Sequence, residues 1–163
     1  MRVGVLRETK DREMRVALLP GTTGCWQPDV SPDGRTGVFT KQEGHSKVDS
    51  TIMEVTLGSD ELRPLTRGSH PRFSRDGRLI VFQRDLQNGS SDIWIMRADG
   101  GSKRQITRTD DSEEYPSLSP DGRYVVYASV RGDVKESHLF VARVSDGVEQ
   151  EVTHNGQASR PVW

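Results

Sequence analysis

The sequence repeats itself, and the length of the repeat constrains the fold more than any other feature. The motif Pro-x-apolar-Ser-x-Asp-Gly-Arg begins at Pro28, Pro71 and Pro116, and a fourth copy begins at Pro161, close to the last residue. These prolines are separated by 43, 45 and 45 residues. Repeats of about 40–45 residues that hold several strands are typical of β-propeller blades. The spacing therefore predicts a propeller-like array.

The centre of each motif predicts a tight turn between two strands. In the first copy Ser31, Pro32, Asp33 and Gly34 occupy the four positions of a type I turn in the order that this turn prefers. Arg75 replaces the proline in the second copy, which type I geometry tolerates. A short strand is expected before each turn and a second strand after it.

Apolar runs mark the second and third strands of each repeat. Their apolar residues are consecutive rather than alternating, as expected when a strand is covered on both faces. A fourth, more polar strand is expected at 65–66, 106–107 and 152–153. The apolar runs are short and are interrupted by glycine and proline, which disfavours helices. The runs lie at 37–39, 79–82 and 124–127 for the second strand, and at 51–55, 93–96 and 139–142 for the third.

These patterns predict an all-β fold. We expect three four-stranded antiparallel propeller blades within residues 24–163, with partial-blade strands at both ends of the chain, the last being the first strand of a fourth blade. One aromatic residue per second strand should lie in the core. The expected blade limits are about 28–70, 71–115 and 116–160, and the expected core aromatics are Phe39, Phe82 and Tyr127.

The repeats resemble the propeller repeat of the TolB family and of the propeller domains in prolyl-oligopeptidase-like peptidases. The resemblance rests on the Pro-x-apolar-Ser-Pro-Asp-Gly core, the apolar pair after it, and the Asp-Ile-Trp-Ile-Met run at Asp92–Met96. It covers about residues 24–163 and implies the propeller fold. Its implications for function are few, because propellers carry many unrelated tasks.

Residues 1–23 differ from the repeats. Residues 1–20 resemble the opening of alanine dehydrogenases, a family in which the arginine matching Arg15 contacts the substrate carboxylate. That family also needs a Gly-x-Gly-x-x-Gly dinucleotide site, which this sequence lacks, so dehydrogenase activity is not expected. The segment also aligns with the third and fourth strands of the second repeat. An outer strand pair of a partial blade and an unrelated leader both stay open.

Composition excludes several classes of partner and compartment. The 23 basic and 24 acidic residues leave a net charge of −1, whereas nucleic-acid binding needs a clustered basic face. No segment approaches the roughly 20 apolar residues of a membrane span. The N-terminus lacks the apolar core of a signal peptide, which predicts a cytoplasmic protein for the sequence as written. A periplasmic or extracellular location is expected instead if the chain is part of a longer one.

No catalytic, metal or cofactor motif is found. The segment Gly44–Val48 fails the Gly-x-Ser-x-Gly pattern of hydrolases at its last position. None of the four histidines has another histidine or a cysteine at the spacing of a zinc site. The acidic stretch 109–114 lacks the glycine and the alternating acidic positions of a calcium loop. The single cysteine, Cys25, allows no internal disulfide. We therefore expect no enzyme activity and no cofactor.

One set of residues is selected by its position. In the TolB-type repeat, the residues just before the first strand lie at one mouth of the central channel. Here they differ between copies while the surrounding scaffold repeats, as a binding surface would, although loop residues also vary without function. The candidate binding residues are Trp26, Gln27, His70, Glu114, Tyr115 and Arg160.

Two functions are compatible with this pattern. The first is an interaction module that binds a protein or a small ligand at the channel mouth. The second is the non-catalytic propeller of a larger prolyl-oligopeptidase-like hydrolase. Three blades cannot close a ring, and unpaired strand edges favour association. We therefore expect a homodimer that completes a six-bladed ring, with a strained four-bladed ring within one chain as the alternative.

Overall fold

The computed structural model describes residues 25–42, 44, 46–59, 61–131, 136–153 and 160–163. Over these residues the chain forms twelve strands and one short 3-10 helix, η1 (Lys47–Asp49). The all-β prediction is confirmed. The blades are antiparallel meanders of four strands each. Blade 1 holds β1 (Cys25–Val30), β2 (Thr36–Gln42), β3 (Ser50–Thr56) and β4 (Leu62–Arg67); blade 2 holds β5 (Ser69–Phe73), β6 (Leu79–Asp85), β7 (Ser91–Arg97) and β8 (Arg104–Gln105); blade 3 holds β9 (Ser112–Leu118), β10 (Tyr124–Val130), β11 (Ser137–Arg143) and β12 (Glu149–Glu151).

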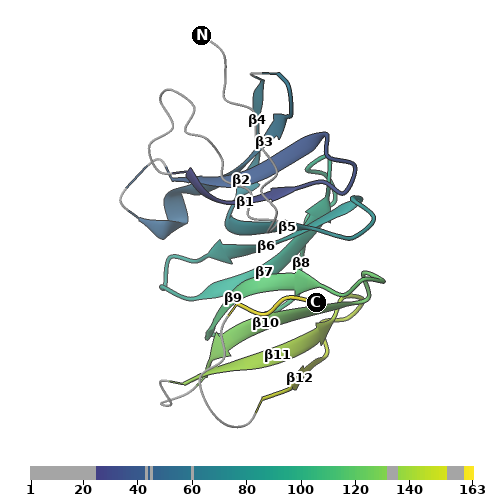
Figure 1. Cartoon of the computed structure of the whole chain (residues 1–163). Coiled ribbons are helices and arrows are strands. Elements are labelled where there is room, and N and C mark those ends of the chain that lie inside the picture. Colours follow the sequence, from purple (N-terminus) through teal and green to yellow (C-terminus); the bar gives the residue numbers. More distant parts are fainter. Residues whose placement is uncertain (1–24, 43, 45, 60, 132–135, 154–159) are drawn as a thin grey trace.

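The three blades stack in chain order, with blade 2 between the other two (Figure 1). The first strands of neighbouring blades contact one another, β1 with β5 and β5 with β9. A single parallel bridge between Ser91 of β7 and Ser112 of β9 also links blades 2 and 3. The candidate site residues lie on or next to these first strands, so the stacking brings them toward one another.

Side-chain hydrogen bonds fix the turn between the first and second strands. In blade 1 the hydroxyl of Ser31 donates to Oδ1 of Asp33 over 2.6 Å, and the same oxygen accepts the amide of Arg35 at 3.1 Å. Gly34 takes a φ of 70°, which only glycine adopts freely. The same hydroxyl–carboxylate bond lowers the pKa of the aspartate in all three blades. In the other two it joins Ser74 to Asp76 at 2.7 Å and Ser119 to Asp121 at 2.6 Å.

Two apolar cores lie between the blades, and the second strand of blade 2 contributes to both. Ile80 and Phe82 pack with Val38 and Ile52 of blade 1. Val81, which points the other way, packs in the second core. Successive side chains of a strand point to opposite faces, so a strand between two blades needs apolar residues at every position. The predicted core aromatics are confirmed as buried: Phe39, Phe82 and Tyr127 are 1%, 1% and 0% exposed.

The fourth strands of blades 2 and 3 end before the residues predicted for them. The Ile-Thr pair at 106–107 and the Val-Thr pair at 152–153 lie just beyond β8 and β12. In both blades a threonine hydroxyl takes the place of a backbone carbonyl as the acceptor for an amide of the third strand. Oγ1 of Thr107 accepts the amide of Ile93 at 2.9 Å, and Oγ1 of Thr153 accepts the amide of Leu139 at 2.8 Å. The third strands are therefore satisfied although the regular ladder has ended.

The ends of the repeats also differ from the expected limits. Each first strand begins before the motif proline, at Cys25, Ser69 and Ser112, because pairing continues on the N-terminal side of an irregularity described below. Residues 160–163 are not assigned to a strand, and the amide of Trp163 donates to the Ser117 hydroxyl at 3.3 Å. The N-terminal segment 1–23, with its two alternative interpretations, lies outside the described residues.

Truncation of the blade 2 aromatic tests this packing. Phe82→Ala removes a ring that is 1% exposed between blades 1 and 2. Loss of such a side chain costs about 3–5 kcal/mol, a large part of the roughly 5–15 kcal/mol that stabilises a domain. Thermal unfolding followed by circular dichroism should show a large decrease in Tm. Val148→Ala, at a position 59% exposed, is the control and should unfold close to the wild type. Equal Tm values for the two variants would contradict the described core.

Candidate functional site

Each first strand contains a β-bulge at the candidate site. In blade 2, Ser69 pairs with Gln83 and Arg72 pairs with Val81, so the two residues between them, His70 and Pro71, oppose only one residue of β6. Blades 1 and 3 show the same irregularity around Gln27 and Tyr115. The single residue opposite the bulge is in each case the buried core aromatic, Phe39, Phe82 or Tyr127. Bulges of this kind change the direction of a side chain and are frequent near functional sites.

The residue at each bulge has a left-handed backbone. Gln27, His70 and Tyr115 have φ values of 56°, 53° and 57°, and Arg160, at the same position of the fourth copy, has 54°. A residue before proline is ordinarily extended, and a non-glycine residue in this region costs on the order of 1–3 kcal/mol. The position of these residues in the repeat was predictable from the sequence, but this conformation was not. Its recurrence in every copy motivates a functional hypothesis, because such strain is concentrated at functional sites.

Four of the six candidate residues, three at the bulges and Arg160 after blade 3, form one continuous row. Nε2 of Gln27 lies within hydrogen-bonding distance of Nε2 of His70. The His70 ring meets the Tyr115 ring edge to face, with centroids 4.6 Å apart and an interplanar angle of 88°. The guanidinium of Arg160 lies 5.4 Å from the centroid of Tyr115. We call Gln27, His70, Tyr115 and Arg160 the bulge row.

The other two candidate residues stand beside the row. Trp26 pairs with Thr40 of β2, and Glu114 pairs with Ala128 of β10, in each case one residue before the bulge. Both are half-buried. Within the described part of the chain, no hydrogen bond, ion pair or ring contact joins either side chain to the bulge row.

Hydrogen bonds hold the first half of the row in place. Oε1 of Gln27 accepts the hydroxyl of Thr40 at 3.0 Å and the amide of His70 at 3.1 Å. Because the Gln27 amide group donates to Nε2 of His70, the ring proton belongs on Nδ1, which donates to the Ser69 hydroxyl at 3.2 Å. Ser69 in turn donates to Oδ2 of Asp85 at 3.4 Å. The imidazole is therefore fixed in one tautomer and one orientation.

His70 is neutral at physiological pH. Burial lowers the pKa of His70 to about 4, and the positive charges of Arg160, Lys47 and Arg72 contribute in the same direction. Arg160 is exposed and carries the charge of the row. The row thus presents one cation, two rings and one carboxamide.

Ser69, His70 and Asp85 are the residue types of a hydrolytic triad, but they are connected in the wrong order. In such a triad the histidine accepts the serine proton and the carboxylate orients the histidine. Here His70 donates to Ser69, and Ser69 donates to Asp85. Ser69 is also only 5% exposed. This geometry provides no activated nucleophile.

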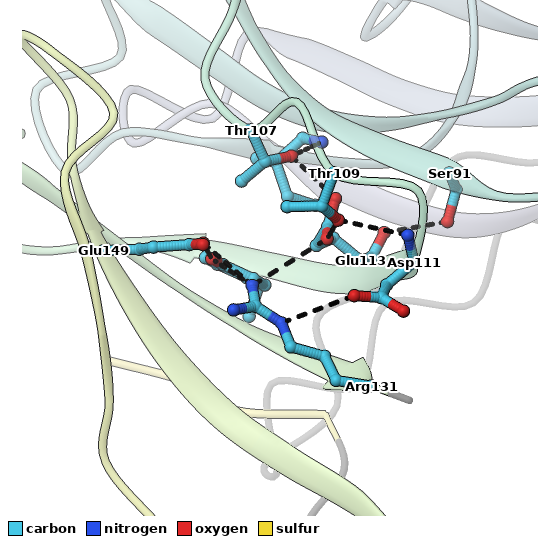
Figure 2. Close-up of polar contacts among 9 residues, drawn as sticks. Ser91, Thr107, Thr109, Asp111, Glu113, Arg131 and Glu149 are labelled. Atoms are coloured by element: carbon cyan, nitrogen blue, oxygen red, sulfur yellow. Dashed lines mark hydrogen bonds and ion pairs between the residues drawn. The ribbon is translucent and has the colours of Figure 1, made fainter. Parts of the chain in front are cut away.

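A second polar cluster lies between blades 2 and 3, and sequence reasoning did not find it (Figure 2). Its centre is Glu113, which is fully buried. Thr107 donates to one carboxylate oxygen at 2.9 Å, and Thr109 donates to the other. Ser91 of β7 donates to the backbone carbonyl of Glu113 at 3.0 Å. The acidic stretch 109–114 was considered only as a calcium loop, whereas its Glu113 is an internal hydrogen-bond acceptor.

Arg131 closes this cluster on one side. Its guanidinium lies 2.8 Å from Glu149, 3.9 Å from Glu113 and 4.0 Å from Asp111, and 3.7 Å from the centroid of the Phe140 ring. Burial raises the pKa of Glu113 to about 7, and the two threonine hydroxyls and Arg131 only partly offset this effect. The cluster therefore exchanges a proton near neutral pH.

Known proteins with this architecture can now be compared. Four-stranded blades stacked through their first strands define a β-propeller. The sequence profile of the TolB beta propeller domain matches residues 11–163, and the chain belongs to that family. The match includes the second half of the N-terminal segment. None of the helices in the described residues is long and apolar enough to cross a membrane.

Three relatives illustrate the range of proteins that share this domain. The uncharacterized peptidase YuxL of Bacillus subtilis is 29% identical over 115 residues, 65% of this chain and 17% of that protein. The uncharacterized protein Atu1656 of Agrobacterium fabrum is 38% identical over 107 residues, 64% of this chain and 36% of that protein. The solved structure of a putative TolB from Agrobacterium tumefaciens is 27% identical, with a TM-score of 0.63 over 75% of this chain and 46% of the other. The chain thus spans less than half of each relative's length.

The buried carboxyl predicts a specific pH dependence of stability. The folded-state pKa of Glu113 is about 7, above the ordinary value of 4.5, so the folded state binds more protons between these pH values. The stabilising contribution is complete below pH 4.5 and is lost as the pH rises through 7. Glu113→Gln cannot titrate. The free energy of unfolding of Glu113→Gln minus that of the wild type should therefore increase by roughly 1–3 kcal/mol as the pH rises from 4.5 to 8.

Urea unfolding at a series of pH values checks this difference. The lowered pKa of His70 acts in the opposite direction over part of the same range, since there the folded state binds fewer protons. It is present in both proteins and cancels in the comparison. The exposed Glu61→Gln variant is the control for loss of a carboxylate. Parallel pH curves for the wild type and Glu113→Gln would contradict the assignment.

Proposed function

We propose that this chain is a non-catalytic binding module that holds a segment of a protein partner against the bulge row. The observation that carries the proposal is the row itself. The same strained residue in four successive copies aligns four different side chains into one continuous surface. The scaffold repeats while the presented groups differ, as in other proteins that use a rigid framework to display a binding surface.

The chemistry of the row favours a peptide segment with a carboxylate. Arg160 is an exposed cation that stacks on a ring and can form paired hydrogen bonds with a carboxylate. Tyr115 and His70 provide half-buried rings in a fixed edge-to-face arrangement. Tyrosine and arginine are the residue types most often found at the energetic centre of protein interfaces.

The same groups are poor catalysts. A general base works best when its pKa is near the working pH, whereas the pKa of His70 is about 4. Both nitrogens of its ring are occupied by Gln27 and Ser69. A second candidate function, the non-catalytic propeller of a larger prolyl-oligopeptidase-like hydrolase, is favoured by the relative that is named a peptidase. In that setting the bulge row would bind a segment of the substrate or of the partner domain.

We also propose that the chain associates with a second copy to complete a six-bladed ring. Val162 and Trp163, beside the fourth motif copy, are 76% and 51% exposed, and such apolar groups favour association. A closed two-fold arrangement would cover the outer faces of blades 1 and 3 in both copies.

Mutation of the row tests the binding proposal. Peptides would be selected from a displayed library on the wild-type protein, and their Kd values measured by calorimetry. Arg160→Ala and Tyr115→Ala should each weaken the selected peptides at least tenfold, or about 1.4 kcal/mol, because both side chains face the ligand. Arg75→Ala, an exposed turn residue, should leave Kd unchanged. Selected peptides that bind both row variants as tightly as the wild type would refute the role of the row.

The association proposal is tested by mass in solution. Light scattering of a homodimer should give twice the chain mass of 18.2 kDa at micromolar concentration. Deletion of residues 1–20 should weaken the dimer if this segment supplies the strands that join the two copies. A monodisperse mass of 18.2 kDa for the intact chain would exclude the dimer.

A further inference from the structure

A cleft lies between blades 1 and 2, at the end of the blades that carries η1. It is formed by the segment after β2, the end of β4, the end of β6 and the start of β7. The residues that matter for its chemistry are Lys47, Arg67, Arg84, Asp92, Trp94 and Gln105.

Hydrogen bonds through Ser69 connect the cleft to the bulge row. Asp85 lines the cleft and accepts a hydrogen bond from Ser69, whose hydroxyl also contacts the ring of His70. Lys47 lines the cleft as well, and its charge contributes to the lowered pKa of His70. Asp85 and Lys47 thus link the lining of the cleft to His70 of the row.

One buried polar atom at the cleft lacks a partner among the described residues. Nε1 of Trp94 is buried and has no acceptor there. The nearby Asp92 is 2% exposed, and Gln105 donates to its Oδ2 at 2.8 Å. Burial raises the pKa of this carboxyl, and hydrogen bonds from Gln105, Thr107 and the Thr109 backbone partly offset the effect. An unmet buried donor costs about 1–3 kcal/mol, so a ligand that accepts from the Trp94 N–H gains affinity.

The unpaired N–H and the charges of the cleft define a ligand chemistry. A peptide carbonyl can accept a hydrogen bond from Nε1 of Trp94. Three cations line the same cleft beside Asp85: Lys47 and Arg67 are exposed, and the Arg84 guanidinium lies 5.0 Å from the centroid of the Trp94 ring. Such a cationic rim attracts acidic side chains and accelerates their association.

The neighbouring groove shows the alternative arrangement. Between blades 2 and 3, the buried Glu113 has its oxygens satisfied by Thr107 and Thr109, and Arg131 closes the cluster. Between blades 1 and 2 the buried Nε1 of Trp94, which lines the cleft, has no acceptor among the described residues. The buried carboxylate is satisfied in one groove, whereas a buried donor stays without an acceptor in the other.

We propose that this cleft is a second subsite for the same partner, in which an acidic peptide segment places one carbonyl against the indole N–H of Trp94 and its carboxylates against Lys47, Arg67 and Arg84. This assignment rests on the proposed function of the bulge row and specifies its ligand as an acidic extended segment. The row would hold one end of the segment and the cleft the other.

A defined acidic probe tests the subsite. The probe is a fluorescein-labelled peptide, Gly-Asp-Glu-Asp-Glu-Gly, with blocked ends, and its binding is followed by anisotropy at low salt. Arg67→Glu should weaken binding at least tenfold because it reverses a charge on the rim. Arg75→Glu makes the same charge change on an exposed turn outside the cleft and should alter Kd less than twofold. Trp94→Phe keeps a ring but removes the indole N–H, and should weaken binding several-fold in a protein of unchanged fold by circular dichroism.

The outcomes separate the cleft from the row. Equal affinity of the wild type and Arg67→Glu would overturn the subsite, as would equal binding of the neutral peptide Gly-Asn-Gln-Asn-Gln-Gly. Displacement of the probe by an equimolar amount of inorganic phosphate would also overturn it, because the site would then accept any small anion. Loss of binding in Arg160→Ala but not in Arg67→Glu would support the row alone. Loss in Arg67→Glu but not in Arg160→Ala would support the cleft and count against the row.

Discussion

The second strand of each blade is covered on both faces, and the rest of the structure follows from this double burial. Ile80 and Phe82 pack toward blade 1, while Val81 packs toward blade 3, so blade 2 keeps its place only between two neighbours. Apolar burial of this kind supplies most of the stabilisation of a domain. It also forces the strand order, because a strand with two apolar faces has no side that can remain in water. The turns and hydrogen bonds described above operate within that arrangement.

The bulges connect this core to the surface. Each bulge lies opposite a core aromatic residue, and the strained residue of the bulge points its side chain into the row. The packed ring on one strand thus faces the position on the other strand where the backbone changes direction. The left-handed residue is tolerated because the packed core around the bulge holds the local backbone in that conformation. A carboxamide, an imidazole, a phenol ring and a guanidinium can therefore occupy equivalent positions without a change in the strands beneath them.

Much of the fold was predictable from the sequence, and less of the site. The repeat spacing, the Ser-x-Asp-Gly turns and the consecutive apolar runs gave the blades and the buried aromatics, because these features depend on local chemistry and on periodicity. The row was selected by position, but the left-handed backbone of Gln27 or His70 was not, since the residue before a proline is ordinarily extended. The Glu113 cluster was missed because it joins Thr107, Glu113 and Arg131 across two blades, and no short motif records such contacts. The strand pair or leader at residues 1–23 stays a prediction.

The left-handed position has a consequence for how such a surface can change over time. Four neighbouring places on one surface carry different side chains. Three of them are each held by their own blade, so a substitution at one of these leaves the backbone of the others intact. Binding specificity can then change through substitution of one row residue at a time, while the buried apolar core continues to supply the free energy of folding. A protein built in this way can acquire a new partner without first losing its fold.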